Sequence, residues 1–296
     1  MNMDFPLTEA KLLLFVGWNI EKGLSESTIR SYLSGLNKIS LGKGWGKIEN
    51  NTPLINEVLT GHKHNMHSDE FRGEEEANSN ETRLPCTIPI LRLLKSEILK
   101  SNLPSDDKIV IWAVASLATY GAFRIGELLC KSPKAYDPNS TLLKQDIWFA
   151  NDIIEGESKE AVHVRIKVSK TNNGPPETVI VYQTNTPTCP LRAIKKLQKM
   201  NKHLPEDAPF FTNSEGKPLT QKYLNKILKK LLGKHLKGGV ITGHSFRAGL
   251  ISMFAREGFS ESQLKEIGRW SSRAYECYVK LGRSKRHEMA IACSKK

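Results

Sequence analysis

Two short runs rich in β-branched residues interrupt a chain that otherwise shows the apolar spacing of helices. The runs are AVHVRIKV (161–168) and TVIVYQ (178–183), and the loop between them contains Asn172, Asn173 and Gly174. Such runs on either side of a turn-forming loop are typical of a β-hairpin. Because helical patterns lie on both sides of this region, the sequence predicts an α-dominated mixed α+β fold with a small antiparallel β-sheet.

The first 66 residues carry three helical patterns, two of which begin at residues that can cap a helix, Thr8 and Ser25. Residues 67–83 differ in character, because they are polar, acidic and poor in apolar side chains. That composition is typical of a linker. We therefore expect a helical N-terminal domain at 1–66, a linker at 67–83 and a larger domain at 84–296.

The first candidate functional residue is Arg124, in the segment GAFRIGELL (121–129). If the preceding helical pattern continues through this segment, Leu117, Arg124 and Leu128 lie on one face, and a permanent cation falls in an apolar stripe. A buried charge costs several kcal/mol unless it is paired and hydrogen-bonded. An ion pair with Glu127, or a side chain that reaches solvent, is the structural alternative to a functional role.

The segment HSFRAG (244–249) repeats this pattern, because Arg247 shares a helical face with Leu250 and Ile251. His244 lies three residues earlier, so it projects from the same side if the helix has already begun. Two guanidinium groups in one pocket of low dielectric are unfavourable without an anion between them. A phosphodiester is such an anion, and its two nonbridging oxygens match the forked donors of arginine.

The segment GRWSSRAYECYV (268–279) contains an indole N–H donor, Trp270, and a tyrosine that can act as a covalent nucleophile, Tyr278. The unperturbed pKa of tyrosine is about 10, so a nucleophilic phenol needs neighbouring cations or a base at neutral pH. Each residue also has a structural explanation, as a core indole and as an amphipathic surface phenol.

In this order, Arg124, the His244–Arg247 step, Trp270 and Tyr278 resemble the catalytic set of the tyrosine recombinases of the phage-integrase superfamily. The ending GRWSS-x-A-Y-x-x-Y is most similar to the crypton and DIRS-type recombinases of eukaryotic mobile elements. The similarity covers roughly the last two thirds of the chain by motif. The first third carries no motif of the family and resembles its core-binding domain only in being a small helical domain.

The resemblance implies a site-specific recombinase or transposon integrase that cleaves and rejoins DNA. Tyr278 would attack a phosphodiester, form a 3′-phosphotyrosyl bond and release a 5′-hydroxyl, without a cofactor or a metal. The family pattern places an aromatic residue at Tyr275 and the nucleophile at Tyr278. Exchange between two duplexes implies a tetramer on DNA and a Holliday junction.

The resemblance also assigns roles to residues that the patterns alone do not single out. Lys170, in the loop between the two β-rich runs, would protonate the leaving 5′ oxygen, and Lys167 is the competing candidate. Glu127 matches the acidic position that follows the first arginine of the family and would orient Arg124 or His244.

The net charge of +13 favours a polyanionic partner, which the resemblance identifies as double-stranded DNA. No apolar run reaches eighteen residues, so we expect no membrane span. The resemblance also implies that there is no small-molecule substrate. The five cysteines are scattered and include no C-x-x-C pair, which argues against a disulfide framework or a zinc ribbon. We expect reduced thiols in an intracellular, nuclear protein. They are Cys86, Cys130, Cys189, Cys277 and Cys293.

Three alternatives remain open on the sequence. A type IB topoisomerase uses the same chemistry within one duplex. A domesticated DNA-binding protein would have lost catalysis, although the complete set of candidate residues argues against such decay. A basic RNA-binding protein would not need Tyr278.

Overall fold

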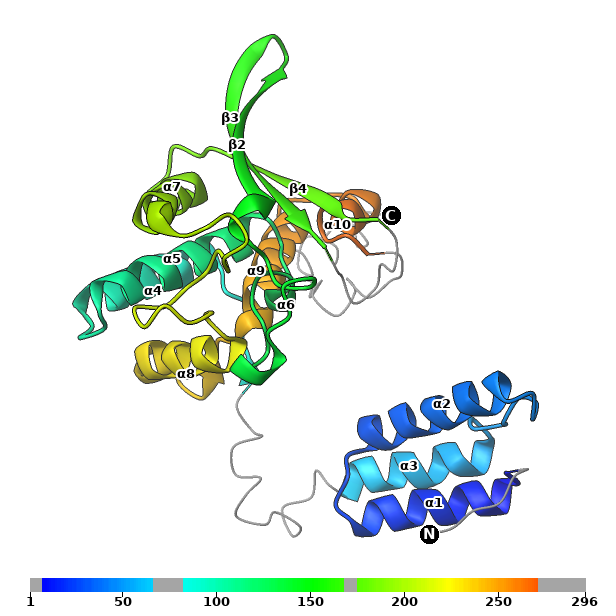
Figure 1. Ribbon diagram of the computed structural model, residues 1–296. Coiled ribbons are helices and arrows are strands. Elements are labelled where there is room, and N and C mark those ends of the chain that lie inside the picture. Colours follow the sequence, from blue (N-terminus) through cyan, green and yellow to red (C-terminus); the bar gives the residue numbers. More distant parts are fainter. Residues whose placement is uncertain (1–6, 66–81, 168–174, 271–296) are drawn as a thin grey trace, which may run out of the picture. The chain divides into compact units, whose positions relative to one another are not determined.

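The computed structural model describes residues 7–65, 82–167 and 175–270. The chain divides into two compact units, Met1–Asn80 and Glu81–Lys296 (Figure 1).

The first unit is a bundle of three helices, α1 (Glu9–Glu21), α2 (Glu26–Gly42) and α3 (Pro53–Asn65). The two expected caps are present, because the side chains of Thr8 and Ser25 accept hydrogen bonds from backbone N–H groups at the starts of α1 and α2. Apolar side chains from the helices, with one from the connection before α3, form the core: Leu12, Val16, Ile29, Leu33, Ile48, Ile55 and Leu59.

The second unit is built around one almost fully buried helix, α5 (Ser105–Tyr120), which packs against α4, α7 and α9. Small residues in α5, among them Ala113, Ala115 and Ala118, let these neighbours approach closely. The other helices of this unit are α4 (Ile88–Lys100), α6 (Ile125–Leu128), α7 (Pro190–Met200), α8 (Gln221–Leu232), α9 (Gly243–Arg256) and α10 (Glu261–Ile267).

An antiparallel sheet of three strands, in the order β2-β3-β4, accompanies these helices. The two β-rich runs form β3 (Glu157–Ile166) and β4 (Glu177–Tyr182), whereas β2 (Ile147–Ile154) was not singled out from the sequence. The turn between β2 and β3 has positive φ at both Glu155 and Gly156, as in the tight turns that match strand twist. This hairpin extends beyond the helices that cover its base (Figure 1).

The expected linker ends earlier than the sequence suggests. Thr82 and Arg83, which we assigned to the linker, form β1 and pair in parallel with β5 (Gly239–Val240). The next residue continues the contact, because the Leu84 N–H donates to the carbonyl of Val240 at 2.9 Å. These backbone hydrogen bonds make both residues part of the second unit.

At Gly249, helix α9 lies close to the backbone of Cys86. A Cβ at this position would overlap the carbonyl group of Cys86. The backbone of Cys86 is held close to α9 because its N–H donates to the carbonyl of Ser245 at 2.7 Å. We expect Gly249→Ala to destabilise the second unit by about 1–3 kcal/mol. Gly233→Ala is the matched control, because Gly233 has helical dihedrals and open space around its Cα. Urea unfolding midpoints that are equal for the two variants would contradict this expectation.

Candidate active site

The chain turns sharply between α5 and α6, so the continuous helix that we expected through Arg124 is wrong. Helix α5 ends at Tyr120, Gly121 caps it, and Ala122 adopts a left-handed φ of 46°. Arg124 therefore lies at the N-cap of α6 and not inside a helix. The turn is stabilised from within, because Phe123 is fully buried in the core.

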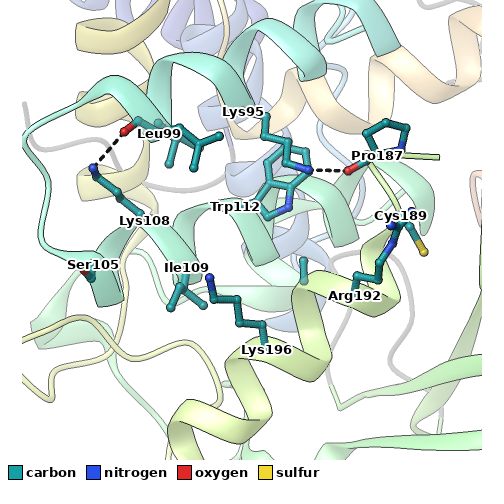
Figure 2. A pocket seen from close by; sticks show the side chains of 12 residues that line it. Lys95, Leu99, Ser105, Lys108, Ile109, Trp112, Pro187, Cys189, Arg192 and Lys196 are labelled. Atoms are coloured by element: carbon teal, nitrogen blue, oxygen red, sulfur yellow. Dashed lines mark hydrogen bonds between the residues drawn. The ribbon is translucent and has the colours of Figure 1, made fainter.

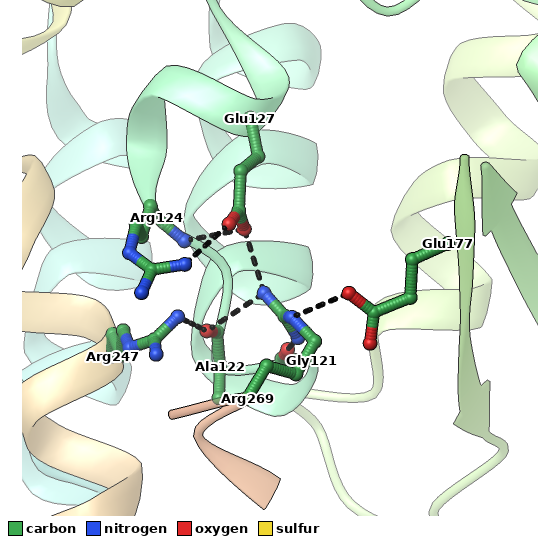
Figure 3. A network of polar contacts seen from close by, with 7 residues as sticks. All are labelled: Gly121, Ala122, Arg124, Glu127, Glu177, Arg247 and Arg269. Carbon is green, nitrogen blue, oxygen red and sulfur yellow. Dashed lines mark hydrogen bonds and ion pairs between the residues drawn. The ribbon is translucent and has the colours of Figure 1, made fainter. Parts of the chain in front are cut away.

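Glu127 holds Arg124 at two points (Figure 3). One carboxylate oxygen accepts the backbone N–H of Arg124 at 2.9 Å, and the other accepts a guanidinium N–H at 3.0 Å. The Glu127 side chain is 3% exposed and that of Arg124 is 17% exposed. A carboxylate that bonds both the backbone and the side chain of one residue restricts the direction of its guanidinium group.

Helix α9 carries His244 and Arg247 one turn apart, and the helix has begun before both of them, at Gly243. Arg247 is only 4% exposed. Its Nη1 donates to the carbonyl of Ala122 at 3.1 Å, and its guanidinium carbon lies 4.4 Å from the ring centroid of Trp270. Arg247 is therefore anchored to the turn before Arg124 and to an aromatic face, which favours its cation.

A pocket of about 330 Å³ opens beside α6 and brings Arg124, Glu127 and His244 together. His244 is exposed, so its imidazole is accessible to a ligand from solvent. The remaining lining comes from α6, from the loop that follows it and from α8: Ile125, Gly126, Leu129, Cys130, Lys131, Ser140, Thr141 and Gln221. This pocket combines permanent cations with a group that can transfer a proton.

A third arginine, Arg269, joins this cluster although we did not single it out from the sequence. Its guanidinium group donates to the carbonyls of Gly121 and Ala122 and to the carboxylate of Glu127 (Figure 3). These partners lie more than 140 positions away in sequence, so no local spacing could identify them. The available signal was a third arginine directly before Trp270.

Two of the predicted catalytic residues, Lys170 and Tyr278, lie outside the described residues, as does Tyr275. The structure thus brings together Arg124, Glu127, His244, Arg247 and Trp270 from the predicted set.

Lys167, the competing candidate for the proton donor, directly follows the last residue of β3 and is bonded there. Its Nζ lies 2.7 Å from a carboxylate oxygen of Asp146, which is fully buried, and it donates to the carbonyls of Pro138 and Thr141. Arg165 binds the same carboxylate. To reach a ligand elsewhere, Lys167 would have to leave all three acceptors.

A larger pocket of about 510 Å³ lies between α4, α5 and α7 (Figure 2) and contains none of the candidate residues. Lys95 crosses it, with its Nζ donating to the carbonyl of Pro187 at 2.6 Å and lying 5.1 Å from the ring centroid of Trp112. Burial, and then the nearby Arg192, lower the pKa of Lys95. The described residues that line this pocket include no tyrosine, histidine or carboxylate, so it does not replace the site beside α6 as the candidate for catalysis.

Within the described ranges, no three histidine, cysteine, aspartate or glutamate side chains are arranged to hold a metal ion. Cys86, Cys130 and Cys189 are buried thiols without disulfide partners. None of the helices in this part of the chain has the length and the apolar character that a membrane crossing requires.

The fold is the mixed α+β fold of the tyrosine recombinases, which confirms the fold class predicted from the sequence. The chain superposes on the site-specific recombinase XerH in a post-cleavage complex with a palindromic difH substrate. The TM-score is 0.58 at 15% identity, over 96% of this chain and 69% of that one.

The Tn1549 transposon integrase shares the fold as well. Bound to transposon right-end DNA it gives a TM-score of 0.57 at 16% identity, over 98% of this chain and 87% of that one. Bound to circular intermediate DNA it gives 0.53 at 16% identity, over 96% and 85%. No protein-family model and no curated protein matches the sequence.

Proposed function

We propose that this protein is a tyrosine recombinase that cleaves and rejoins double-stranded DNA. The observation that carries the proposal is the convergence of two guanidinium groups, those of Arg124 and Arg247, on one turn of the backbone beside a pocket that His244 also lines. Forked donors held in this way suit the nonbridging oxygens of a phosphodiester. The known structures that share this fold include recombinases and integrases bound to DNA.

In the proposed reaction, the phenol of Tyr278 gives its proton to the neutral imidazole of His244 as its oxygen attacks the phosphorus of a DNA phosphodiester. The bond to the 5′ oxygen breaks, Lys170 protonates that oxygen, and the DNA remains attached through a 3′-phosphotyrosyl bond. Attack by a 5′-hydroxyl then restores the phosphodiester and releases the tyrosine. Because the phosphotyrosyl bond retains the energy of the broken bond, no high-energy cofactor is consumed.

The remaining candidates stabilise the charge that develops on the phosphate. Arg124 and Arg247 bind its nonbridging oxygens, and His244 and Trp270 contribute further N–H donors. Glu127 orients Arg124 through the two contacts described above.

Between the two candidate lysines, we favour Lys170 as the proton donor because of the contacts that Lys167 makes. Lys167 is bonded to Asp146 and to two carbonyl groups, and its displacement would leave the buried carboxylate of Asp146 with fewer partners.

We also propose the finer features that rest on the sequence pattern. The ending from Gly268 to Tyr278 supports a crypton or DIRS-type transposon recombinase that acts in the nucleus as a tetramer on DNA, through a Holliday junction. In this proposal the first unit is the core-binding domain, and the second is the catalytic domain. The rival within the same chemistry, a type IB topoisomerase, would relax supercoiled DNA but would not recombine two sites.

Trapping a covalent intermediate tests the proposed function. Duplexes that the protein selects from a randomised pool would be nicked at successive positions, so that cleavage releases a short fragment and cannot be reversed. We expect a protein–DNA band that survives denaturation and disappears after protease treatment. A pure binding protein, whether for DNA or RNA, would select a ligand and yield no such band at any nick position.

We expect excess EDTA to leave the yield of this adduct unchanged, because arginine side chains supply the positive charge around the phosphate. The measurement compares adduct formation in EDTA with that in magnesium. Loss of the adduct in EDTA, with recovery on addition of magnesium, would contradict the proposal that arginine side chains supply the positive charge around the phosphate.

A further inference from the structure

We propose that Arg269 is a positioning residue for this reaction, which sets the geometry of Arg124 and of the turn before it. The inference rests on the proposed function and extends it to a residue to which neither the sequence pattern nor the fold assigns a role. Arg269 immediately precedes Trp270, at the start of the segment that leads to Tyr278.

Arg269 binds both sides of the turn between α5 and α6. Its Nη1 donates to the carbonyl of Gly121 at 2.9 Å, and its Nη2 donates to the carbonyl of Ala122 at 3.3 Å and to the carboxylate of Glu127 at 2.6 Å. The Ala122 carbonyl also accepts Arg247, so one backbone group anchors two arginines. A shift of this turn would therefore move the whole cluster.

The carboxylate of Glu127 is shared between two guanidinium groups. One oxygen accepts the side chain of Arg124, and the other accepts the backbone N–H of Arg124 and the side chain of Arg269. The side chains of Glu127 and Arg269 are 3% and 10% exposed. In such a buried environment, a carboxylate with two charged partners is held more firmly than one with a single partner.

The backbone at Arg269 indicates that its side chain is needed there. Its φ is 50°, in the left-handed region where glycine would be less strained. The neighbouring Gly268 meets a different requirement, because a Cβ at that position would overlap the ring of Trp270. The contacts of the Arg269 guanidinium group therefore offset a backbone cost that glycine would avoid.

Arg269 also reaches two other parts of the second unit. Its guanidinium carbon lies 5.2 Å from the ring centroid of Phe123, and its Nε lies 4.0 Å from the carboxylate of Glu177 at the start of β4. The residue thus links the segment before Trp270 to the turn, to Glu127 and to the sheet. We infer that its removal allows Arg124 to shift, which slows the chemical step without weakening DNA binding.

The test compares Arg269→Met and Arg269→Lys with the wild-type protein at saturating DNA. We expect Arg269→Met to lower the first-order rate of adduct formation by roughly 10- to 100-fold, because misplacement by about 1 Å has effects of this size. The dissociation constant for DNA should not change. Lysine keeps the charge but lacks the fork that binds two carbonyls and a carboxylate, so its rate should be intermediate. Arg256→Met, at an exposed arginine that ends α9, is the matched control and should react as the wild type does.

A double-mutant cycle with Glu127→Gln separates positioning from a merely structural role. If Arg269 acts through Glu127, the loss caused by Arg269→Met should be much smaller in the Glu127→Gln background. A wild-type rate for Arg269→Met, or additive losses in the cycle, would overturn the inference while the proposed function stands.

Two further measurements complete the test. On a duplex with a neutral methylphosphonate at the cleaved position, the defect of Arg124→Ala should shrink because the charge that Arg124 neutralises is absent. The defect of Arg269→Met should shrink with it, because Arg269 acts through Arg124. An Arg269→Met defect that persists on this duplex would overturn the positioning role. If the wild type forms no adduct, the proposed function fails. The link between Arg269 and Glu127 can then still be tested by measuring the urea unfolding midpoints of Arg269→Met, Glu127→Gln and the double variant. Additive changes in these midpoints would refute the link.

Discussion

We expect Tyr278→Phe to bind DNA and to form no covalent adduct, whereas Tyr275→Phe retains adduct formation. The substitution removes only the phenol oxygen, which is the proposed nucleophile, so the loss should be complete. Tyr275 is the matched control, because it lies three residues earlier and differs from phenylalanine by the same single atom. The measurement is the yield of covalent complex on a nicked duplex, together with DNA affinity.

Peptide mapping of the trapped adduct provides the decisive check on this assignment. An adduct on Tyr275 would contradict the choice of nucleophile and leave the proposed chemistry intact. Adduct formation by Tyr278→Phe at the wild-type rate would have the same meaning. A Tyr278→Phe protein that no longer binds DNA would instead assign Tyr278 a structural role.

We expect Arg124→Ala and Arg247→Ala each to lower the cleavage rate by about 10²- to 10³-fold, as is typical when one donor to a transition-state oxyanion is removed. DNA affinity should change far less, because many other cations contribute to binding, as the net charge of +13 indicates. The measurement is the rate of adduct formation at saturating DNA, with Arg256→Ala as a control at an exposed arginine.

The two arginines differ in how directly their variants can be interpreted. Arg247 is almost fully buried and donates to the Ala122 carbonyl, so Arg247→Ala also leaves a cavity and an acceptor without this donor. Arg124 is more exposed, so we expect its variant to perturb folding less. Thermal melting should accompany both rates, and normal cleavage by a folded variant would remove that arginine from the proposed mechanism.

The features that the sequence predicted well are those that neighbouring residues determine. The caps at Thr8 and Ser25 and the strands β3 and β4 follow from residue types a few positions apart. In the same way, His244 and Arg247 lie one turn apart on α9 because a helix brings residues i and i+3 together.

The sequence was misleading where the tertiary structure overrides local pattern. The helical spacing from Leu117 to Leu128 does not form one helix, because the buried side chain of Phe123 and the left-handed Ala122 turn the chain. Strand β2 was not singled out because Asn151 and Asp152 interrupt its apolar pattern. Pairing with β3 decides its conformation.

By itself, the sequence determined the α+β class, the residue types available for phosphate chemistry, and the local spacing that places His244 beside Arg247. Only the tertiary structure decided that Glu127 lies between two arginines and that Arg269 belongs to the cluster. The physical reason is that the contact between Arg269 and Glu127 joins residues more than 140 positions apart. The packing of α5, α6 and α9 determines such distances, and no periodicity within a single segment records them.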